Sequence, residues 1–204
     1  MPDEQHSRHV FEPEVIRGIA ARLRVQWLLH HFDERKVWAA FMFVNGFITI
    51  GLLSLVALGT GTPFVFPSLG PTAFLFFFDP RAPSASPHHA VIGHGIGILC
   101  GYGSLVLFHL EHSGSALALG VTGPRVLAAA LSLAATGALM ILLKAAHPPA
   151  GATTLIVSLG AIARPLHLAV IEVALVLLVL QAIAINRLAG LDYPLWRVRE
   201  SAAR

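Results

Sequence analysis

The chain has 204 residues, of which 55% are hydrophobic and 12% are charged, whereas soluble domains have about 25% charged residues. Twelve of the 25 charged residues lie in Met1–Lys36 and six in Arg187–Arg204, which leaves seven for the 150 residues between them. Seven charges cannot keep a folded core of that length in water, and a net charge of +3 is too small for a phosphate-binding surface. Composition therefore excludes a soluble enzyme, a disordered protein and a nucleic-acid-binding protein, and indicates an integral membrane protein.

Four stretches are long enough to cross a bilayer, which takes about 20 mostly apolar residues. The first twenty residues have no apolar core of the kind found in cleaved signals, so we expect residues 1–36 to remain as a cytoplasmic segment. Between Pro13 and Trp27 this segment is amphipathic, which predicts a helix lying on the membrane surface. Residues 192–204 form the expected cytoplasmic C-terminal tail. The four predicted spans are Val37–Leu58, His88–Leu110, Gly120–Leu143 and Leu166–Ile185.

Two further apolar stretches, Thr60–Phe78 and His147–Gly160, are interrupted by proline and glycine. Each ends in about ten apolar residues, which is half of a membrane crossing. Their opening parts cannot be regular helix, because proline fixes φ and lacks an N–H donor. Irregular backbone survives at membrane depth only where protein buries it or where it lines a wet cavity. We therefore predict an extended approach followed by a half-helix in each stretch, with surface loops that have apolar tips as the alternative.

These two stretches align with each other at an offset of 81 residues, and the same offset relates the spans around them. The predicted fold is an all-α polytopic membrane protein with two repeats of span, half-helix and span, in residues 37–110 and 118–191. Paired segments of this kind mark the binding sites of many transporters. If each half-helix and its approach cross the membrane, the repeats are inverted, and if they dip in and return, the repeats are parallel. The length of the extended approach favours the inverted arrangement.

Three short segments of the chain carry a family resemblance. At His147 the sequence reads His-Pro-Pro-Ala-Gly-Ala-Thr-Thr, and at Ser68 it reads Ser-Leu-Gly-Pro-Thr-Ala. Together with the pair Gly93-His94, these segments resemble the signature of the HPP family of integral membrane proteins. The resemblance covers Val37 to Arg187. It implies a membrane protein with four helices and a role in transport, with nitrite as the substrate to which some relatives are linked.

The start of each half-helix has the chemistry of an anion site. The first turn of a helix has N–H groups without partners and a partial positive charge, and proline fits there because its missing donor would be unpaired anyway. We expect the two starts to meet near the midplane and to hold a monovalent anion, with ordinary helix caps as the alternative. The predicted binding residues are Ser68, Leu69, Gly70 and Thr72 in the first half, and His147, Pro148, Pro149, Ala150, Gly151, Ala152, Thr153 and Thr154 in the second.

Ionisable groups at membrane depth are costly, so they are candidates for function by default. His147, His94 and Glu172 fall in this class and predict a proton relay, in which a Glu–His pair passes the proton. The eleven histidines lack the spacing of metal ligands, so we expect no metal and no other cofactor. Glycines at positions 93, 97 and 101 form a ridge of small residues along one span, which predicts close helix packing within the protomer or across a dimer.

Taken together, the residues and the resemblance predict passive or proton-linked transport of a small monovalent anion, with nitrite as the candidate that the resemblance implies. A channel-like anion pore and a non-transporting subunit of a membrane complex are the alternatives. An enzyme is not expected, because the sequence has no nucleophile–base pair and no cofactor motif. The expected partners are a small inorganic anion, the lipid bilayer and further copies of the chain. The expected location is a bacterial-type inner membrane, with both termini in the cytoplasm.

Overall fold

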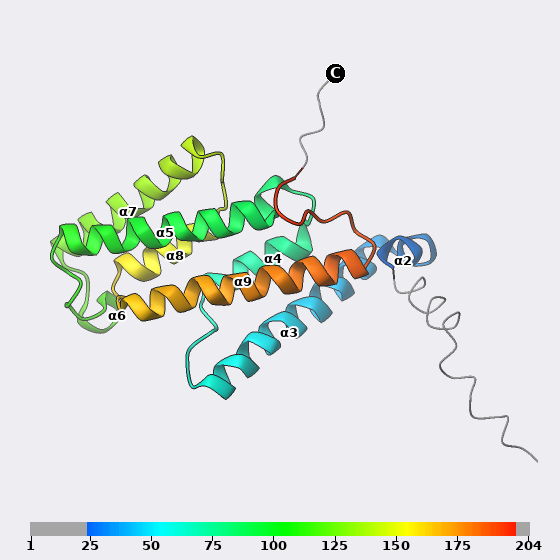
Figure 1. Ribbon diagram of the computed structural model, residues 1–204, viewed down its shortest axis with the longest axis horizontal. Coiled ribbons are helices and arrows are strands. Elements are labelled where there is room, and N and C mark those ends of the chain that lie inside the picture. Colours follow the sequence, from blue (N-terminus) through cyan, green and yellow to red (C-terminus); the bar gives the residue numbers. More distant parts are fainter. Residues whose placement is uncertain (1–23, 199–204) are drawn as a thin grey trace, which may run out of the picture.

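The computed structural model describes residues 24–198, which form helices and connecting turns without any strand (Figure 1). Four of these helices are long and apolar enough to cross a membrane, which confirms the predicted spans and the all-helical polytopic class. Every end of these helices lies within three residues of its predicted position. The four are α3 (Glu34–Thr60), α5 (Pro87–Leu107), α7 (Gly123–Leu142) and α9 (Pro165–Leu188).

Local chemistry explains where the long helices begin and end. The Asp33 carboxylate accepts a hydrogen bond from the Lys36 amide and caps α3, and the Ser86 hydroxyl caps α5 in the same way. Helices α5, α7 and α9 each have proline in their first two positions, where its fixed φ favours the helix and its missing donor has no cost. Helix α3 ends at Thr60, and the next residue, Gly61, caps it with a φ of 64° that suits glycine.

Two short apolar helices lie where the half-helices are predicted, namely α4 (Leu69–Phe78) and α8 (Ala150–Ser158). Each follows a non-helical segment that contains proline. The remaining elements are short: α2 (Val25–His31) comes before α3, η2 (Pro83–Ala85) before α5, and α6 (Ala116–Leu119) before α7. Most of the predicted surface helix between Pro13 and Trp27 lies outside the described residues.

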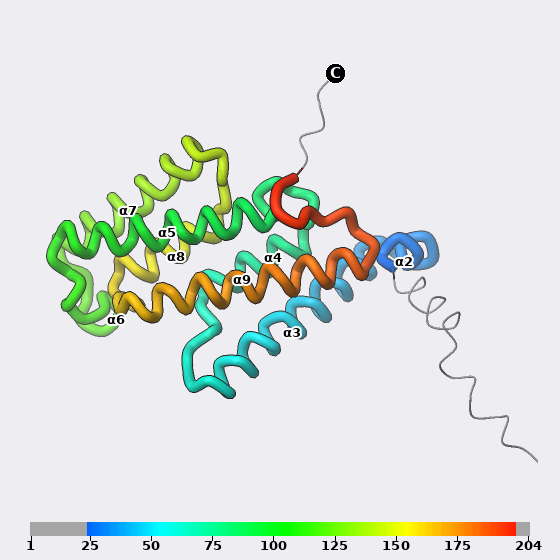
Figure 2. The backbone as a smooth tube through the Cα atoms, viewed as in Figure 1, coloured from blue at the N-terminus to red at the C-terminus, as the bar shows by residue number. Residues whose placement is uncertain are grey.

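Backbone hydrogen bonds show which helix ends lie together. At one end of the molecule the Val25 amide donates to the Ala189 carbonyl, and the His88 amide donates to the Trp196 carbonyl. The starts of α3 and α5 therefore lie beside the end of α9. At the other end the Ala116 amide donates to the Leu159 carbonyl, which places the ends of α5 and α8 beside the start of α7 (Figure 2).

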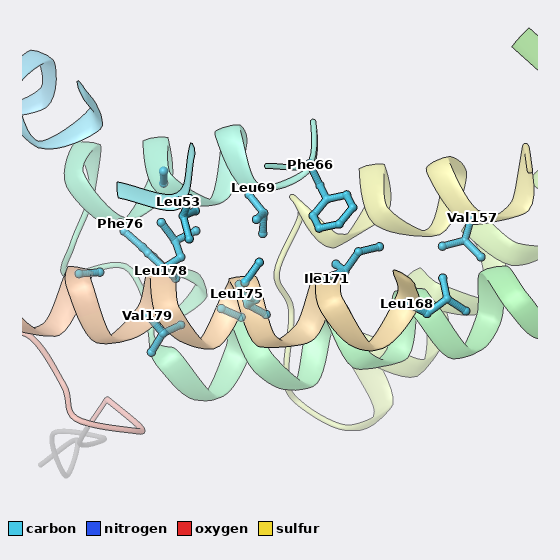
Figure 3. Packing of buried hydrophobic residues seen from close by; sticks show 14 of the residues in the cluster. Leu53, Phe66, Leu69, Phe76, Val157, Leu168, Ile171, Leu175, Leu178 and Val179 are labelled. Carbon is cyan, nitrogen blue, oxygen red and sulfur yellow. The ribbon is translucent and has the colours of Figure 1, made fainter. Parts of the chain in front are cut away.

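It follows that α3 and α5 run in one direction, and that α7 and α9 run in the other. The half-helices α4 and α8 start near the middle and run to opposite ends. Figure 3 shows Phe76 of α4 and Val157 of α8 at the two ends of the buried cluster, with Leu69 between them. These directions are those of the inverted arrangement, while the descent of the two halves from one repeat stays a prediction.

The two halves of the chain interlock. Helix α5 packs against α7 and α8, helix α9 packs against α3 and α4, and α5 and α9 also pack against each other. The last span of each half therefore completes a bundle with the helices of the other half, and we call these the α5–α7–α8 bundle and the α3–α4–α9 bundle. The main hydrophobic cluster runs along α9, with Ile171, Leu175 and Leu178 fully buried in it (Figure 3).

Cysteine labelling tests these directions. Arg81 and Ser113 are exposed at opposite ends of the molecule, whereas Ala85 beside the first is fully buried and unsuitable. In a Cys100→Ser background, we expect Ser113→Cys to react with an impermeant thiol reagent on intact cells. We expect Arg81→Cys to react only after the membrane is opened. The reverse pattern would contradict inverted halves with a cytoplasmic N-terminus.

Candidate transport site

A buried hydroxyl on α4 connects two histidines. Thr72 lies in the first turn of α4, and its Oγ1 is 2.9 Å from Nε2 of His94 and 3.2 Å from Nε2 of His147. The same oxygen is 3.1 Å from the carbonyl oxygen of Ser68. All four residues are fully buried. Since α4 belongs to one bundle and α5 and α8 to the other, Thr72 joins the two bundles through polar contacts.

The second ring nitrogen of His94 reaches the other half-helix. Its Nδ1 is 2.7 Å from Oγ1 of Thr153, which is fully buried in the first turn of α8. Thr72 and Thr153 are 81 residues apart, so they occupy equivalent positions in the proposed repeat. His94 therefore lies between two equivalent threonines, one from each half-helix.

The second ring nitrogen of His147 fixes the direction of the whole chain of hydrogen bonds. His147 Nδ1 is 2.7 Å from the carbonyl oxygen of Ser84, and a carbonyl can only accept. Nδ1 therefore carries the proton, and Nε2 of the neutral ring accepts from the Thr72 hydroxyl. Nε2 of His94 then donates to Thr72, and the Thr153 hydroxyl donates to Nδ1 of His94. These tautomers are the ones assigned to two neutral rings.

Three glycines bring α8 close enough to α5 for these contacts. A Cβ atom at Gly93 would lie 2.7 Å from Cβ of His147, and one at Gly97 would lie 2.8 Å from the Ala150 carbonyl oxygen. A Cβ atom at Gly101 would be 2.8 Å from Cβ of Val157. The predicted ridge of small residues therefore packs within the protomer, against the start and the length of α8.

Comparison with known proteins identifies the family of the chain. A family model described as "HPP, transmembrane region" matches residues 33–194, which include all four spans and both half-helices. The chain belongs to the HPP family of membrane proteins. No curated protein and no solved structure matches the chain significantly.

The three residues after the His-Pro-Pro triplet of this HPP protein have no free backbone amide for a ligand. The amides of Ala150, Gly151 and Ala152 donate to the carbonyls of His147, Pro148 and Pro149. The prediction that these three amides are free is therefore wrong. The reason is that Pro149 already has helical φ and ψ, so tight turns extend the helix backwards over the prolines and use the donors.

The start of α4 also differs from the prediction. The Leu69 amide donates to the Phe66 carbonyl, so it is not free either. Gly70 is exposed, and a Cβ atom there would meet open space, which places it outside the buried cluster. Ser68 fits the prediction better, because its hydroxyl is buried and has no hydrogen-bond partner among the described residues.

Thr154 and Glu172 lie apart from the histidines. Thr154 Oγ1 is 3.1 Å from Oγ1 of Thr136 on α7, so it contributes to the packing of α7 on α8. Glu172 on α9 makes no hydrogen bond with either histidine, and its Oε2 has no partner within residues 24–198. The predicted Glu–His pair is therefore absent from this part of the chain, and Thr72 occupies the position between the two rings.

Two residues that the sequence analysis missed hold the cluster from outside. Arg125 is buried on α7, and its guanidinium donates to the carbonyls of Ser158 and Gly114. A cation at the C-terminus of α8 stabilises this short helix through its dipole. The lone arginine at the start of a span was the available signal, and its burial was not predictable.

The second missed residue is Tyr193, which follows α9. Its hydroxyl donates to the Ala85 carbonyl at 2.6 Å, next to the Ser84 carbonyl that holds His147. Burial raises the pKa of the Tyr193 phenol above its usual range, so it stays protonated as a donor. The ring of Phe76 lies between Tyr193 and His147, with centroids 6.3 and 6.2 Å away. The described part of the expected tail is therefore packed beside the site.

A groove lies apart from this cluster in the described part of the chain. It has a volume of about 910 Å³, lies between α2, α3 and α9, and has Val25, Phe41 and Ile185 among its lining residues. It includes none of the predicted binding residues. Within residues 24–198, His, Cys, Asp and Glu side chains form no group of three that could hold a metal ion.

Substitution of a ridge glycine tests whether this packing is required. Gly97→Ala places a Cβ atom 2.8 Å from a backbone oxygen of α8, so we expect a loss of about 1–3 kcal/mol in the free energy of unfolding. Gly103→Ala on the same helix meets nothing within 4 Å and is the matched control. Thermal unfolding in detergent measures both variants, and equal melting temperatures would show that α8 does not need this close approach.

Proposed function

We propose that this multi-pass membrane protein transports a small monovalent anion, with nitrite as the first candidate. Its family suggests a role in transport. The observation that carries the proposal is the fully buried cluster of Thr72, His94, His147 and Thr153, which lies among helices long enough to cross a membrane. Buried polar groups at membrane depth are costly, and they mark substrate or ion pathways.

The cluster has donors suited to an anion with two oxygen atoms. The Ser68 hydroxyl has no partner, so it is available to donate without breaking another bond. The Thr153 hydroxyl rotates about its C–O bond and can turn from His94 towards a ligand. Two hydroxyl donors, those of Ser68 and Thr153, can recognise the two oxygen atoms of a small oxyanion in a dry site through charge-assisted hydrogen bonds.

The packing favours a carrier over an open pore. The four residues of the cluster have no exposed surface, so an anion reaches them only if the two bundles move apart on one side. Movement of one repeat bundle against another around a central site is how alternating access works in transporters with inverted repeats. We further propose that both termini lie in the cytoplasm of a bacterial-type inner membrane and that the protein forms a homo-oligomer.

Two buried serines allow a matched test in proteoliposomes. Ser68 and Ser158 both have unpartnered hydroxyls, but the second lies at the far end of α8 beside Arg125. We expect uptake of nitrite above that of protein-free liposomes. We expect Ser68→Ala to weaken apparent affinity about tenfold, because a hydrogen bond to an anion is worth about 1.5–3 kcal/mol.

Ser158→Ala is the control and is expected to transport as the original protein does. Nitrate, formate and chloride should be measured in parallel to define the selectivity. An equal effect of the two substitutions would remove the α4 start from the binding site. Absence of uptake for all four anions would favour a non-transporting subunit.

A further inference from the structure

We propose that the anion crosses together with one proton, which binds Nε2 of His147 while the Thr72 hydroxyl turns from that nitrogen to the Ser68 carbonyl. This inference rests on the proposed anion transport at the same site. It identifies the coupled ion, the atom that receives it and the side chain that makes room for it.

The side chains of the site have no fixed charge. Within residues 24–198, the hydrogen-bond partners of His94 and His147 are threonine hydroxyls and a backbone carbonyl. The buried guanidinium of Arg125 is bonded to carbonyls at the far end of α8. An anion alone in such a site loses its hydration without compensation, and so does an imidazolium alone.

The charges of an anion and of a protonated His147 compensate each other. An anion and a nearby imidazolium neutralise each other's charge, so together they cost far less to bury than either ion by itself. Each ion therefore raises the affinity of the site for the other, and this coupling is reciprocal. A buried neutral histidine beside the anion site is thus sufficient to link the movement of the anion to that of a proton.

The hydrogen bonds around the Thr72 hydroxyl allow a second arrangement, in which His147 carries an additional proton. In the neutral cluster the Thr72 hydroxyl donates to Nε2 of His147. When a proton occupies that nitrogen, Thr72 donates instead to the Ser68 carbonyl, which already lies 3.1 Å away. The two lone pairs of the hydroxyl then accept from Nε2 of His147 and Nε2 of His94, at 3.2 and 2.9 Å. Both arrangements keep every donor of Thr72, Thr153 and the two histidines paired.

The groups around His147 do not hold the proton in the absence of an anion. Helix α4 presents the Thr72 hydroxyl and the ring of Phe76, and the segment before α5 presents the Ser84 carbonyl. The titratable groups nearby are His94 and His89 on α5, Lys144 three residues earlier in the chain, and Tyr193 behind Phe76. None of these is a carboxylate, so the anion itself is the negative partner.

The proton is taken from water on the side from which the anion enters and is released to water on the other side. No bond to the anion forms or breaks. Because both ions leave together, the site returns to its neutral arrangement and the cycle moves no net charge.

The test measures anion and proton in the same vesicles. Purified protein is sealed in liposomes with a trapped pH-sensitive dye, nitrite is added outside, and protein-free liposomes correct for passive permeation. We expect one proton to enter with each nitrite ion. We also expect the rate to stay the same when valinomycin and a roughly tenfold potassium gradient impose a membrane potential.

Uptake of nitrite without protons, at a rate that follows the potential, would overturn proton coupling and leave anion transport standing. Absence of uptake would overturn the transport proposal, and the coupling would fall with it. The two failures are therefore distinguishable in one experiment.

Substitutions at Thr72 separate the switch from general packing. Thr72→Val keeps the shape and removes the hydroxyl, so we expect nitrite uptake to fall at least about tenfold and the residual uptake to carry less than one proton per anion. Thr72→Ser keeps a hydroxyl, so we expect its nitrite uptake and its proton-to-nitrite ratio to match those of the original protein. Thr49→Val removes another fully buried hydroxyl, on α3 away from the histidines, and is expected to leave both unchanged. A normal proton ratio in Thr72→Val would exclude the hydroxyl switch.

Discussion

The site depends on one hydroxyl group that belongs to one bundle and bonds to two histidines of the other. Thr72 occupies the first turn of α4, where the polypeptide enters a half-helix from an extended approach. His94 reaches it from α5, and His147 reaches it from the turn before α8. The close contact of α8 with the glycine ridge of α5 sets the position of His147. Loss of that contact would move the second histidine away from Thr72.

Neutrality is the second constraint on the structure. A cluster of hydroxyls and imidazoles can be buried among apolar spans because each of the ring nitrogens has a partner. The same cluster would not tolerate a single added charge without a counter-ion. The proposed anion site therefore contains no lysine or arginine, and the buried Arg125 lies elsewhere, at the carbonyl end of α8.

Sequence reasoning succeeded where a physical signal is local. Span length, hydropathy and proline positions were enough to predict α3, α5, α7 and α9, and the proline-interrupted stretches lie where α4 and α8 begin. The His-Pro-Pro triplet, taken with the segment at Ser68, the pair Gly93-His94 and the four spans, was enough to indicate the family that the match to residues 33–194 shows. These features depend on residues close together in the chain, so local composition and short motifs are sufficient to predict them.

Sequence reasoning failed where the outcome depends on distant partners or on small changes of backbone. The amides of Ala150, Gly151 and Ala152 were expected to be free, but helical φ and ψ at Pro149 let the turn continue and use them. The Glu172 pair was inferred from residue type alone, and no pattern in the chain indicates that Thr72 lies between the rings. The hydrogen bond from His147 to the Ser84 carbonyl could not be predicted, because every residue has a backbone carbonyl and residue type does not indicate which one is used.

The most direct measurement is the protonation state of the two histidines with and without the anion. Solid-state NMR of the protein in bilayers, with histidine ring nitrogens labelled and assigned by His94→Gln and His147→Gln variants, reports each state. Without nitrite we expect both rings to be neutral, with the proton on Nδ1 of His147 and on Nε2 of His94. With saturating nitrite we expect His147 to become an imidazolium. A neutral His147 ring in the saturated protein, or a charged ring in the absence of an anion, would contradict paired binding of anion and proton.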